Sequence, residues 1–264
     1  MTADAHRVVV RSPIATLFAE PRVASAPISQ LLAGRILEVL EDREDWYRVR
    51  GADEYEGWMP RGYLMPLPDG GTTPPAQAAR ISLGCVTMTT AGYRRPLPLG
   101  AFLAADERVT AGSVIDAAEK DALFPSDGHA ITRSAQRFFE GASYIWGGVT
   151  PWGCDCSGLV QSVFWLHGIQ LRRDAWQQAE QGTPGDDDLM NARVADLLFF
   201  SDRVDQHITH VAISLGGGAL VHLALGRGGY ATEQLDDAAD PYVRKLQERF
   251  VTARRILGSV LHVR

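Results

Sequence analysis

Cys156 is the residue of this chain best placed, by type and context, to do chemistry. It follows Asp155 and opens a segment in which apolar residues recur at helical spacing, with Gly168 where a C-terminal cap belongs. Aspartate is a preferred N-cap residue, so Cys156 is predicted in the first turn of a helix. The helix dipole and the free backbone N–H groups there favour negative charge, which lowers the pKa of a thiol. Cys156 is therefore a candidate nucleophile, and a small buried core residue is the alternative.

Two histidines further along the chain supply what a thiol nucleophile needs, a base and a residue that orients the base. Residues 216–218 are three consecutive glycines. If they form a hairpin loop, residue 212 lies opposite His222, and His210 is a diagonal neighbour of His222 on the same face. We predict that His210 pairs with Cys156 and that His222 holds the His210 ring.

The same two imidazoles allow two other interpretations. They could bind a metal ion with His207 as a third ligand, or they could be ordinary, partly exposed residues. The three cysteines, Cys85, Cys154 and Cys156, lack the spacing of common metal sites. We therefore expect no metal and no cofactor.

An α+β fold is predicted for the half of the chain that holds these residues. An amphipathic helix covers about residues 130–140, the cysteine helix follows, and a short helix is predicted within 175–182. Apolar segments typical of strands come next, at residues 196–200, 209–216, 219–224 and 251–256. Helices followed by a run of antiparallel strands are typical of α+β proteins.

The N-terminal half has a different pattern. Residues 8–65 contain short apolar segments separated by turn residues, which predicts a small β-barrel. Residues 66–78 are rich in Pro, Gly and Thr, as linkers are. We predict one SH3-like domain at 1–68, a second, degenerate SH3-like domain at 80–127, and the catalytic domain at 128–264. An irregular connector is the alternative for the middle segment.

Composition limits the class of protein. The chain has 264 residues, of which 45% are hydrophobic and 22% charged, which is typical of soluble globular proteins. A net charge of −6 and scattered basic residues argue against nucleic acid or a membrane as partner. We see no signal-peptide pattern and no apolar stretch of membrane-spanning length. An odd number of cysteines fits a reducing compartment, so we expect a cytoplasmic protein. The oligomeric state is not indicated.

Several motifs occur in the order found in the NlpC/P60 cysteine peptidases, and the chain resembles this family over about residues 128–264. The motifs are Tyr144 and Trp146 before two glycines, Cys156 before Ser157 and Gly158, Arg173 with Asp174, residues 196–200, His210, and Val221 with His222. The resemblance implies a papain-like core in which Cys156 is the nucleophile, His210 the general base and acid, and His222 the orienting residue. Residues 8–65 are similar to bacterial SH3-like domains.

The chain departs mildly from the family pattern. Cys154 stands where a larger apolar residue is usual, and Ala195 replaces the usual glycine before Asp196. Ala212 and Ser214 replace common glycine and aromatic residues. None of these changes removes a catalytic group, so we expect an active enzyme.

An SH3-like region ahead of such a core resembles the γ-D-glutamyl-L-diamino-acid endopeptidases, which require a free N-terminal L-alanine on the substrate. The resemblance assigns amine recognition to Asp155, Ser157 and Asp174. Carboxylates and a hydroxyl are suitable partners for an ammonium group. The alternative is that Asp155 is only an N-cap and Asp174 only a carboxylate at a helix start.

The resemblance also implies that the SH3-like domain closes this subsite with an acidic residue and a tyrosine. Glu20 and Tyr55 are the candidates, and Tyr63 competes with Tyr55. Tyr144 and Trp146, from the motif ahead of the cysteine, complete the predicted substrate-binding set.

These features predict a cytoplasmic cysteine peptidase that recycles murein peptides. Its partner would be the small peptide L-Ala-γ-D-Glu-meso-diaminopimelate, cut at the γ-D-glutamyl–diamino acid bond through a thioester. One alternative is a papain-like amidase or acyltransferase that acts on another amide. The other is a wall-binding scaffold protein whose SH3-like modules carry the function, although a pure binder has no use for the set Cys156, His210 and His222.

Overall fold

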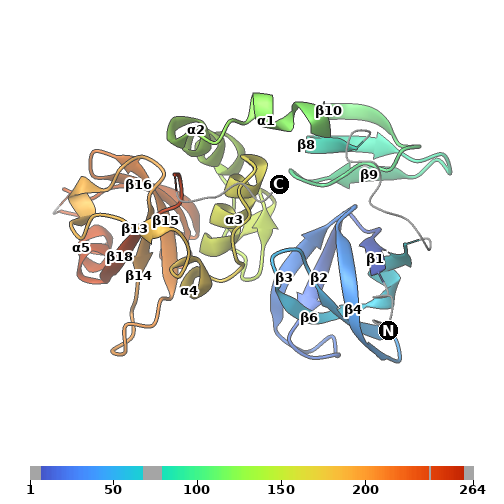
Figure 1. The fold of residues 1–264 in the computed structure, drawn as a ribbon, viewed down its shortest axis with the longest axis horizontal. Coiled ribbons are helices and arrows are strands. Elements are labelled where there is room, and N and C mark those ends of the chain that lie inside the picture. Colours follow the sequence, from blue (N-terminus) through green and yellow to red (C-terminus); the bar gives the residue numbers. More distant parts are fainter. Residues whose placement is uncertain (1–6, 68–78, 238, 259–264) are drawn as a thin grey trace. The chain divides into compact units, whose positions relative to one another are not determined.

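The computed structural model describes residues 7–67, 79–237 and 239–258. The chain divides into two compact units, Met1–Lys120 and Asp121–Arg264 (Figure 1). The predicted linker covers residues 66–78, of which residues 68–78 lie outside the described residues.

A seven-stranded antiparallel sheet with the strand order β3-β2-β6-β5-β4-β1-β7 forms most of the first unit. Its strands are β1 (Arg7–Val10), β2 (Ile14–Phe18), β3 (Pro27–Leu32), β4 (Ile36–Arg43), β5 (Trp46–Arg50), β6 (Glu56–Pro60) and β7 (Leu64–Pro66). Alternate residues of these strands, such as Ala15, Leu17, Val49 and Met59, point inward and form one buried cluster. The strands fall on the apolar segments that the sequence predicted.

The segment predicted as a second barrel forms a three-stranded antiparallel sheet, β10-β8-β9. Its strands are β8 (Arg80–Met88), β9 (Arg94–Leu97) and β10 (Arg108–Asp116). Phe102 packs against Gly34, in the turn between β3 and β4, and its N–H donates to the Ala33 carbonyl at 2.9 Å. Arg35 lies over the Phe102 ring, 5.3 Å from its centre. This sheet and the first belong to one compact unit, which ends at Lys120.

The second unit contains helices ahead of a sheet. Its helices are α1 (Lys120–Leu123, shared with the end of the first unit), α2 (Gly128–Phe139), α3 (Cys156–Leu166), α4 (Ala175–Gln178) and α5 (Pro241–Glu248). Its strands are β11 (Val149–Thr150), β12 (Gly153–Cys154), β13 (Thr183–Pro184), β14 (Leu197–Phe200), β15 (His210–Gly216), β16 (Ala219–Ala224), β17 (Gly229–Gln234) and β18 (Phe250–Arg255). The predicted α+β class is confirmed.

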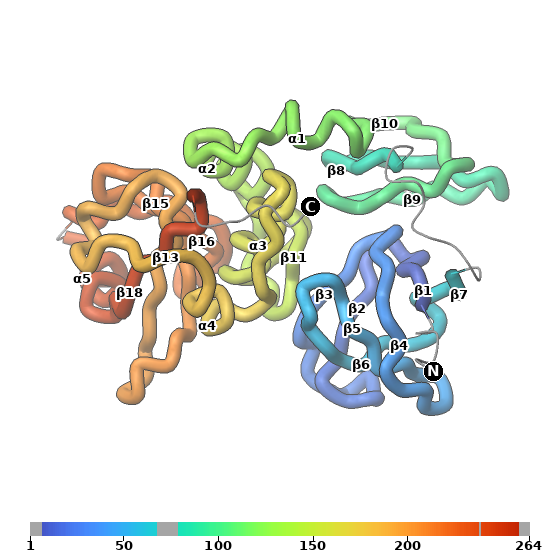
Figure 2. Tube along the Cα trace, in the orientation of Figure 1, coloured from blue at the N-terminus to red at the C-terminus, as the bar shows by residue number. Residues whose placement is uncertain are grey.

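Six of these strands form one antiparallel sheet with the order β13-β18-β14-β15-β16-β17. Helices α2 and α3 lie side by side and pack against β15 and β16 (Figure 1). Leu246 of α5 packs on a cluster that includes Leu198, Ala212 and Leu220. The connection from β14 to β15 extends away from the sheet (Figure 2). The sequence did not predict β13, β17 or α5.

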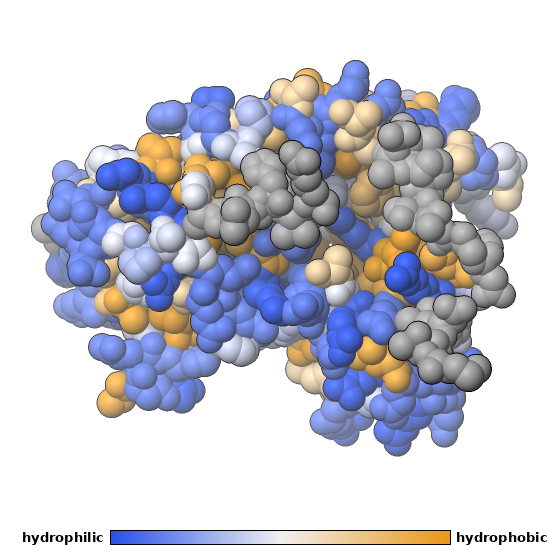
Figure 3. Space-filling view, viewed as in Figure 1, coloured by the Kyte–Doolittle hydropathy of each residue, from blue (hydrophilic) through white to orange (hydrophobic). Residues whose placement is uncertain are grey.

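Hydrophilic residues cover most of the visible surface, and hydrophobic ones lie among them in small groups (Figure 3). Within the described part of the chain, no helix has both the length and the apolar character needed to cross a membrane.

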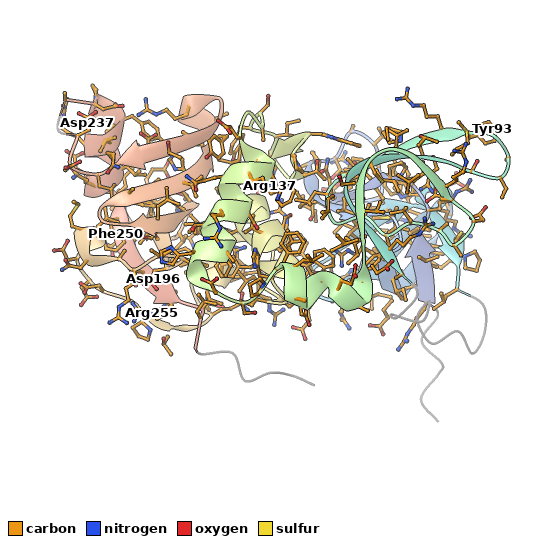
Figure 4. All side chains as sticks on the ribbon, turned by 90° about the horizontal axis from the view of Figure 1, so that it is seen from above. Tyr93, Arg137, Asp196, Asp237, Phe250 and Arg255 are labelled. Carbon is orange, nitrogen blue, oxygen red and sulfur yellow. The ribbon has the colours of Figure 1, made fainter. Side chains whose placement is uncertain are left out.

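Ala195, at the turn before β14, has a left-handed backbone with φ of 65°. The next residue, Asp196, is buried and forms a bidentate ion pair with Arg255 of β18, with N–O distances of 3.0 and 2.8 Å (Figure 4). A left-handed conformation costs an L-residue about 1–2 kcal/mol, and glycine avoids that cost. This explains why glycine is usual at this position and identifies Ala195 as a strained residue.

Ala195→Gly is expected to raise the free energy of unfolding by about 0.5 kcal/mol, because relief of strain exceeds the added entropy of the unfolded chain. Ala192→Gly is the matched control, since Ala192 is also buried but has a φ of −58°. The control should lose about 1 kcal/mol. Thermal and urea unfolding measure both; equal losses in the two variants would contradict the strain at Ala195.

Candidate active site

Helix α3 begins at Cys156, with Asp155 as its N-cap. The Asp155 carboxylate accepts the Gly158 N–H at 2.7 Å, as expected of an N-cap aspartate. A Cβ atom on Gly158 would lie 2.1 Å from the Gly148 carbonyl oxygen, so only glycine fits there. Gly148, just before β11, and the start of α3 are therefore in close backbone contact, which fixes the position of Cys156.

The thiol of Cys156 is buried, with 6% of the residue exposed. Burial, and next the Asp155 carboxylate, raise its pKa to about 12, although the backbone N–H groups of Val211 and Ser157 lower it in part. The position at the helix start predicts a lowered pKa, and that prediction is wrong, because loss of hydration outweighs the helix dipole. The contact with Val211 places the sulfur beside the start of β15, next to His210 in the chain.

The hairpin of β15 and β16 brings the two histidines together. His210 Nε2 lies 2.9 Å from His222 Nδ1, and the ring centres are 5.0 Å apart. Ile213 lies opposite Val221, which is the register that the sequence predicted. The turn is one residue shorter than predicted, because only Gly217 and Gly218 form it. A bulge between Ser214 and Gly216 adds one residue to β15 and compensates for the shorter turn. The bulge preserves the register, so both rings emerge on one face.

His210 is held in its neutral form. Burial, and next the neighbouring His222, lower the pKa of His210 to about 3. Because its Nε2 faces His222, its Nδ1 is the nitrogen that the predicted pairing with Cys156 would use. A neutral imidazole beside a neutral thiol can remove the thiol proton as the sulfur attacks, which is the role of a general base.

Arg173 is a large buried side chain of the site, and the sequence did not predict its role. It is 1% exposed, and its guanidinium forms two bonds to the Asp155 carboxylate, at 3.1 and 2.7 Å. It also donates to Ser157 Oγ at 2.9 Å. With the N–H groups of Gly147 and Gly158, and the Ser157 hydroxyl, the Asp155 carboxylate accepts five protein donors. A carboxylate offers about four lone-pair positions, so all of them are occupied.

Asp174 follows Arg173 and precedes α4. Its residue is half-buried, and its backbone N–H donates to Gln177 Oε1 at 3.1 Å. Trp176, in the same helix, is 41% exposed and contacts the His207 ring with centres 6.0 Å apart. His207 is thus beside an aromatic ring. Among residues 7–67, 79–237 and 239–258, no group of three or more candidate ligands could hold a metal ion.

Tyr144 and Trp146 lie in the segment before the cysteine. Tyr144 is half-buried, and burial, then the charges at Cys156 and Asp155, raise the pKa of its hydroxyl. Trp146 is 65% exposed. Their roles in substrate binding stay predictions.

Glu20, Tyr55 and Tyr63 belong to the first unit. Glu20 is exposed and pairs with Arg22 at 2.8 Å, whereas Tyr55 and Tyr63 pack partly against the core of the first sheet. Their part in closing a substrate subsite stays a prediction.

Glu233 is a site residue that the sequence did not reveal. Its Oε1 lies 3.4 Å from His222 Nε2, on the side of the ring away from His210. The strand register would identify it, since Glu233 is two residues from Ala231, which lies opposite His222. The sequence did not predict strand β17, so it did not predict that Glu233 lies near His222.

Comparison with protein families gives two matches. Residues 141–255 match the NlpC/P60 family, and residues 17–64 match the bacterial dipeptidyl-peptidase SH3 domain. Both resemblances found in the sequence are thereby confirmed.

Curated proteins with related sequences include two named gamma-D-glutamyl-L-lysine dipeptidyl-peptidase. The one from Bacillus subtilis (strain 168) is 41% identical over 88 residues, 32% of this chain and 28% of that protein. The one from Bacillus cereus (strain ATCC 10987 / NRS 248) is 26% identical over 74% of this chain and 66% of that protein. The chain therefore spans less than two thirds of either. Dipeptidyl-peptidase 6 of Lysinibacillus sphaericus is 26% identical over 90% of this chain and 95% of that protein.

Solved structures show the same fold. An NlpC/P60 family protein from Bacillus cereus ATCC 10987 superposes with a TM-score of 0.76 at 17% identity, covering 95% of this chain and 99% of that one. An NlpC/P60 endopeptidase from Photobacterium damselae subsp. piscicida gives a TM-score of 0.67 at 13% identity, with 96% and 71% covered.

Proposed function

Residues 141–255 are an NlpC/P60 domain and residues 17–64 a bacterial SH3 domain, and from this we propose that the chain is a cysteine peptidase of murein peptides. It hydrolyses the γ-D-glutamyl–diamino acid bond of L-Ala-γ-D-Glu-diamino acid. The observation that carries the proposal is the buried thiol at the start of α3, beside β15, whose His210 is hydrogen-bonded to His222 at 2.9 Å.

The reaction proceeds in two halves. The Cys156 sulfur attacks the γ-carbonyl carbon of D-glutamate while His210 Nδ1 takes the thiol proton. The amide C–N bond breaks, the amine of the diamino acid leaves with the proton from His210, and a thioester remains. Water then attacks the thioester carbonyl carbon while His210 removes a proton from that water molecule. The C–S bond breaks, the product acid leaves, and the proton on His210 returns to the sulfur. His222 holds the His210 ring throughout.

Recognition of a free α-amine is part of the proposal. The Asp155 carboxylate is neutralised by Arg173 and has its acceptor positions filled, so the charge that meets the ammonium is assigned to Asp174. The Ser157 hydroxyl, between Asp155 and Arg173, lies beside the nucleophile. Tyr144 and Trp146 are assigned to the walls of the subsite.

A subsite of this kind limits the enzyme to peptides already released from glycan. We therefore propose a role in the recycling of murein peptides, in the cytoplasm. Two relatives named gamma-D-glutamyl-L-lysine dipeptidyl-peptidase support the bond that is cut. The rates on the lysine and diaminopimelate peptides identify the preferred diamino acid.

The test compares free L-Ala-γ-D-Glu-diaminopimelate and its lysine counterpart with their N-acetylated forms, by mass spectrometry of the products. Free peptides should give L-Ala-D-Glu. Acetylation removes a charged hydrogen bond worth about 2 kcal/mol or more, so the acetylated peptides should react at least about 30-fold more slowly. Binding without cleavage would favour the wall-binding alternative, and equal rates on acetylated peptide or intact sacculi would exclude the closed subsite.

Asp174→Asn separates recognition of the amine from catalysis. It should slow cleavage of the free peptide and reduce the difference from the acetylated one. The matched control is Asp188→Asn, because Asp188 is also an N-cap aspartate, in a turn far along the chain from the thiol. The control should leave both rates unchanged.

A further inference from the structure

A buried carboxylate follows the two histidines on the sheet. His222 lies opposite Ala231 across β16 and β17, so Glu233, two residues on, is its diagonal neighbour on the same face. His210 is the diagonal neighbour on the other side, because the register of β15 and β16 brings Ala212 opposite His222. The three side chains therefore form a row across three adjacent strands.

The distances along this row are those of a hydrogen-bonded series. His210 Nε2 and His222 Nδ1 are 2.9 Å apart, and His222 Nε2 and Glu233 Oε1 are 3.4 Å apart. His222 is fully buried, and Glu233 is 6% exposed. Water therefore has little access to either end of the His222 ring, and protein groups decide which nitrogen carries its proton.

Glu233 is held as a carboxylate by a cation. Arg227 donates to both of its oxygens, at 2.8 and 2.9 Å, and also pairs with Asp240. The Arg227 guanidinium lies over the Tyr242 ring, 4.4 Å from its centre, and that ring makes a T-shaped contact with His222, with ring centres 6.0 Å apart. Glu233 is thus an acceptor with a fixed position, and it has no proton to give.

We propose that Glu233 is a positioning residue that fixes the tautomers of both histidines. An ionised carboxylate only accepts, so it requires the proton of His222 on Nε2 and leaves His222 Nδ1 as an acceptor. That acceptor requires the proton of His210 on Nε2. His210 Nδ1 is then unprotonated, which is the form that can take a proton from the Cys156 thiol. Without Glu233, either ring can turn to the opposite tautomer, in which a protonated Nδ1 faces the sulfur.

The role of these tautomers in catalysis rests on the proposed function, whereas the tautomers themselves do not. They are measured by long-range ¹H–¹⁵N correlation spectra of the protein labelled with ¹⁵N-histidine, with signals assigned through single histidine variants. The wild type near neutral pH should show Nε2 protonated and Nδ1 unprotonated in both His210 and His222. A proton on His222 Nδ1 in the wild type overturns the proposal, even if no substrate has been found.

Glu233→Leu removes the acceptor, and Arg227 keeps Asp240 as a partner. Both histidines should become mixtures of tautomers. Turnover should fall about 10- to 100-fold, the usual effect of losing such a supporting partner, while KM stays unchanged. Unchanged ring-nitrogen chemical shifts in this variant would exclude the positioning role of Glu233. If the variant does not fold, the wild-type spectrum still tests the proposal.

The matched control is Glu107→Leu. Glu107 is likewise a buried glutamate, 3% exposed, that pairs with an arginine, Arg95, but it lies in the first unit, and no described histidine is hydrogen-bonded to it. It should leave the tautomers and turnover unchanged. A wild-type spectrum as described together with an inactive protein would support the tautomer assignment and refute the proposed function.

Discussion

Cys156→Ala is expected to lower kcat/KM for the free tripeptide by about 10⁴-fold or more while the protein remains folded. The sulfur forms the bond to the substrate carbonyl, and no other group of the site can replace it. Cys156→Ser should be nearly as inactive, because a hydroxyl in this buried position is far harder to ionise than a thiol. Product formation is followed by mass spectrometry and folding by thermal unfolding.

Cys154→Ala is the matched control for the nucleophile. Cys154 is also buried and lies two residues away, but its thiol donates to the Asp155 carbonyl, and burial and the Asp155 charge raise its pKa well above the usual range. The control should keep most of the activity. An accumulating acyl-enzyme, seen as a mass increase on the peptide that contains residue 156, would add direct support. Normal turnover in Cys156→Ala would refute the mechanism.

Arg173→Met is expected to lower the free energy of unfolding by about 3–5 kcal/mol, because it leaves the buried Asp155 carboxylate without its cation. Both partners are almost inaccessible to water, and methionine fills much of the volume of arginine. Adding Asp155→Asn, which keeps the cap acceptor but removes the charge, should recover part of the loss. Calorimetry of the full chain and amide exchange in α3 measure these changes.

The pair Arg203–Asp205 provides the control for burial. Its N–O distance is also 2.7 Å, but both side chains are more than half exposed. Exposed pairs contribute about 0–1 kcal/mol, so Arg203→Met should have little effect. A similar small effect for Arg173→Met would show that Asp155 is stabilised mainly by the backbone N–H groups and the Ser157 hydroxyl.

The sequence alone determined the parts of the site that depend on local geometry. Asp155 as the N-cap, Cys156 in the first helical turn and Gly168 at the end of α3 follow from residues that are close in the chain. The relation of His210 to His222 was also predictable, because the length of a hairpin connection sets the register of its strands. The actual turn is shorter than predicted, but the bulge restores the same pairing.

The tertiary structure decided what surrounds these groups. Arg173 reaches Asp155 over 18 positions of sequence, and Glu233 reaches His222 through a strand with no clear sequence signal. The direction in which the Cys156 pKa shifts was also decided by the tertiary structure. It depends on how completely other elements exclude water from the thiol, and burial raises the pKa where the helix start alone would lower it. Local sequence fixes caps and register, whereas desolvation and ion pairs depend on contacts that form only when distant segments pack.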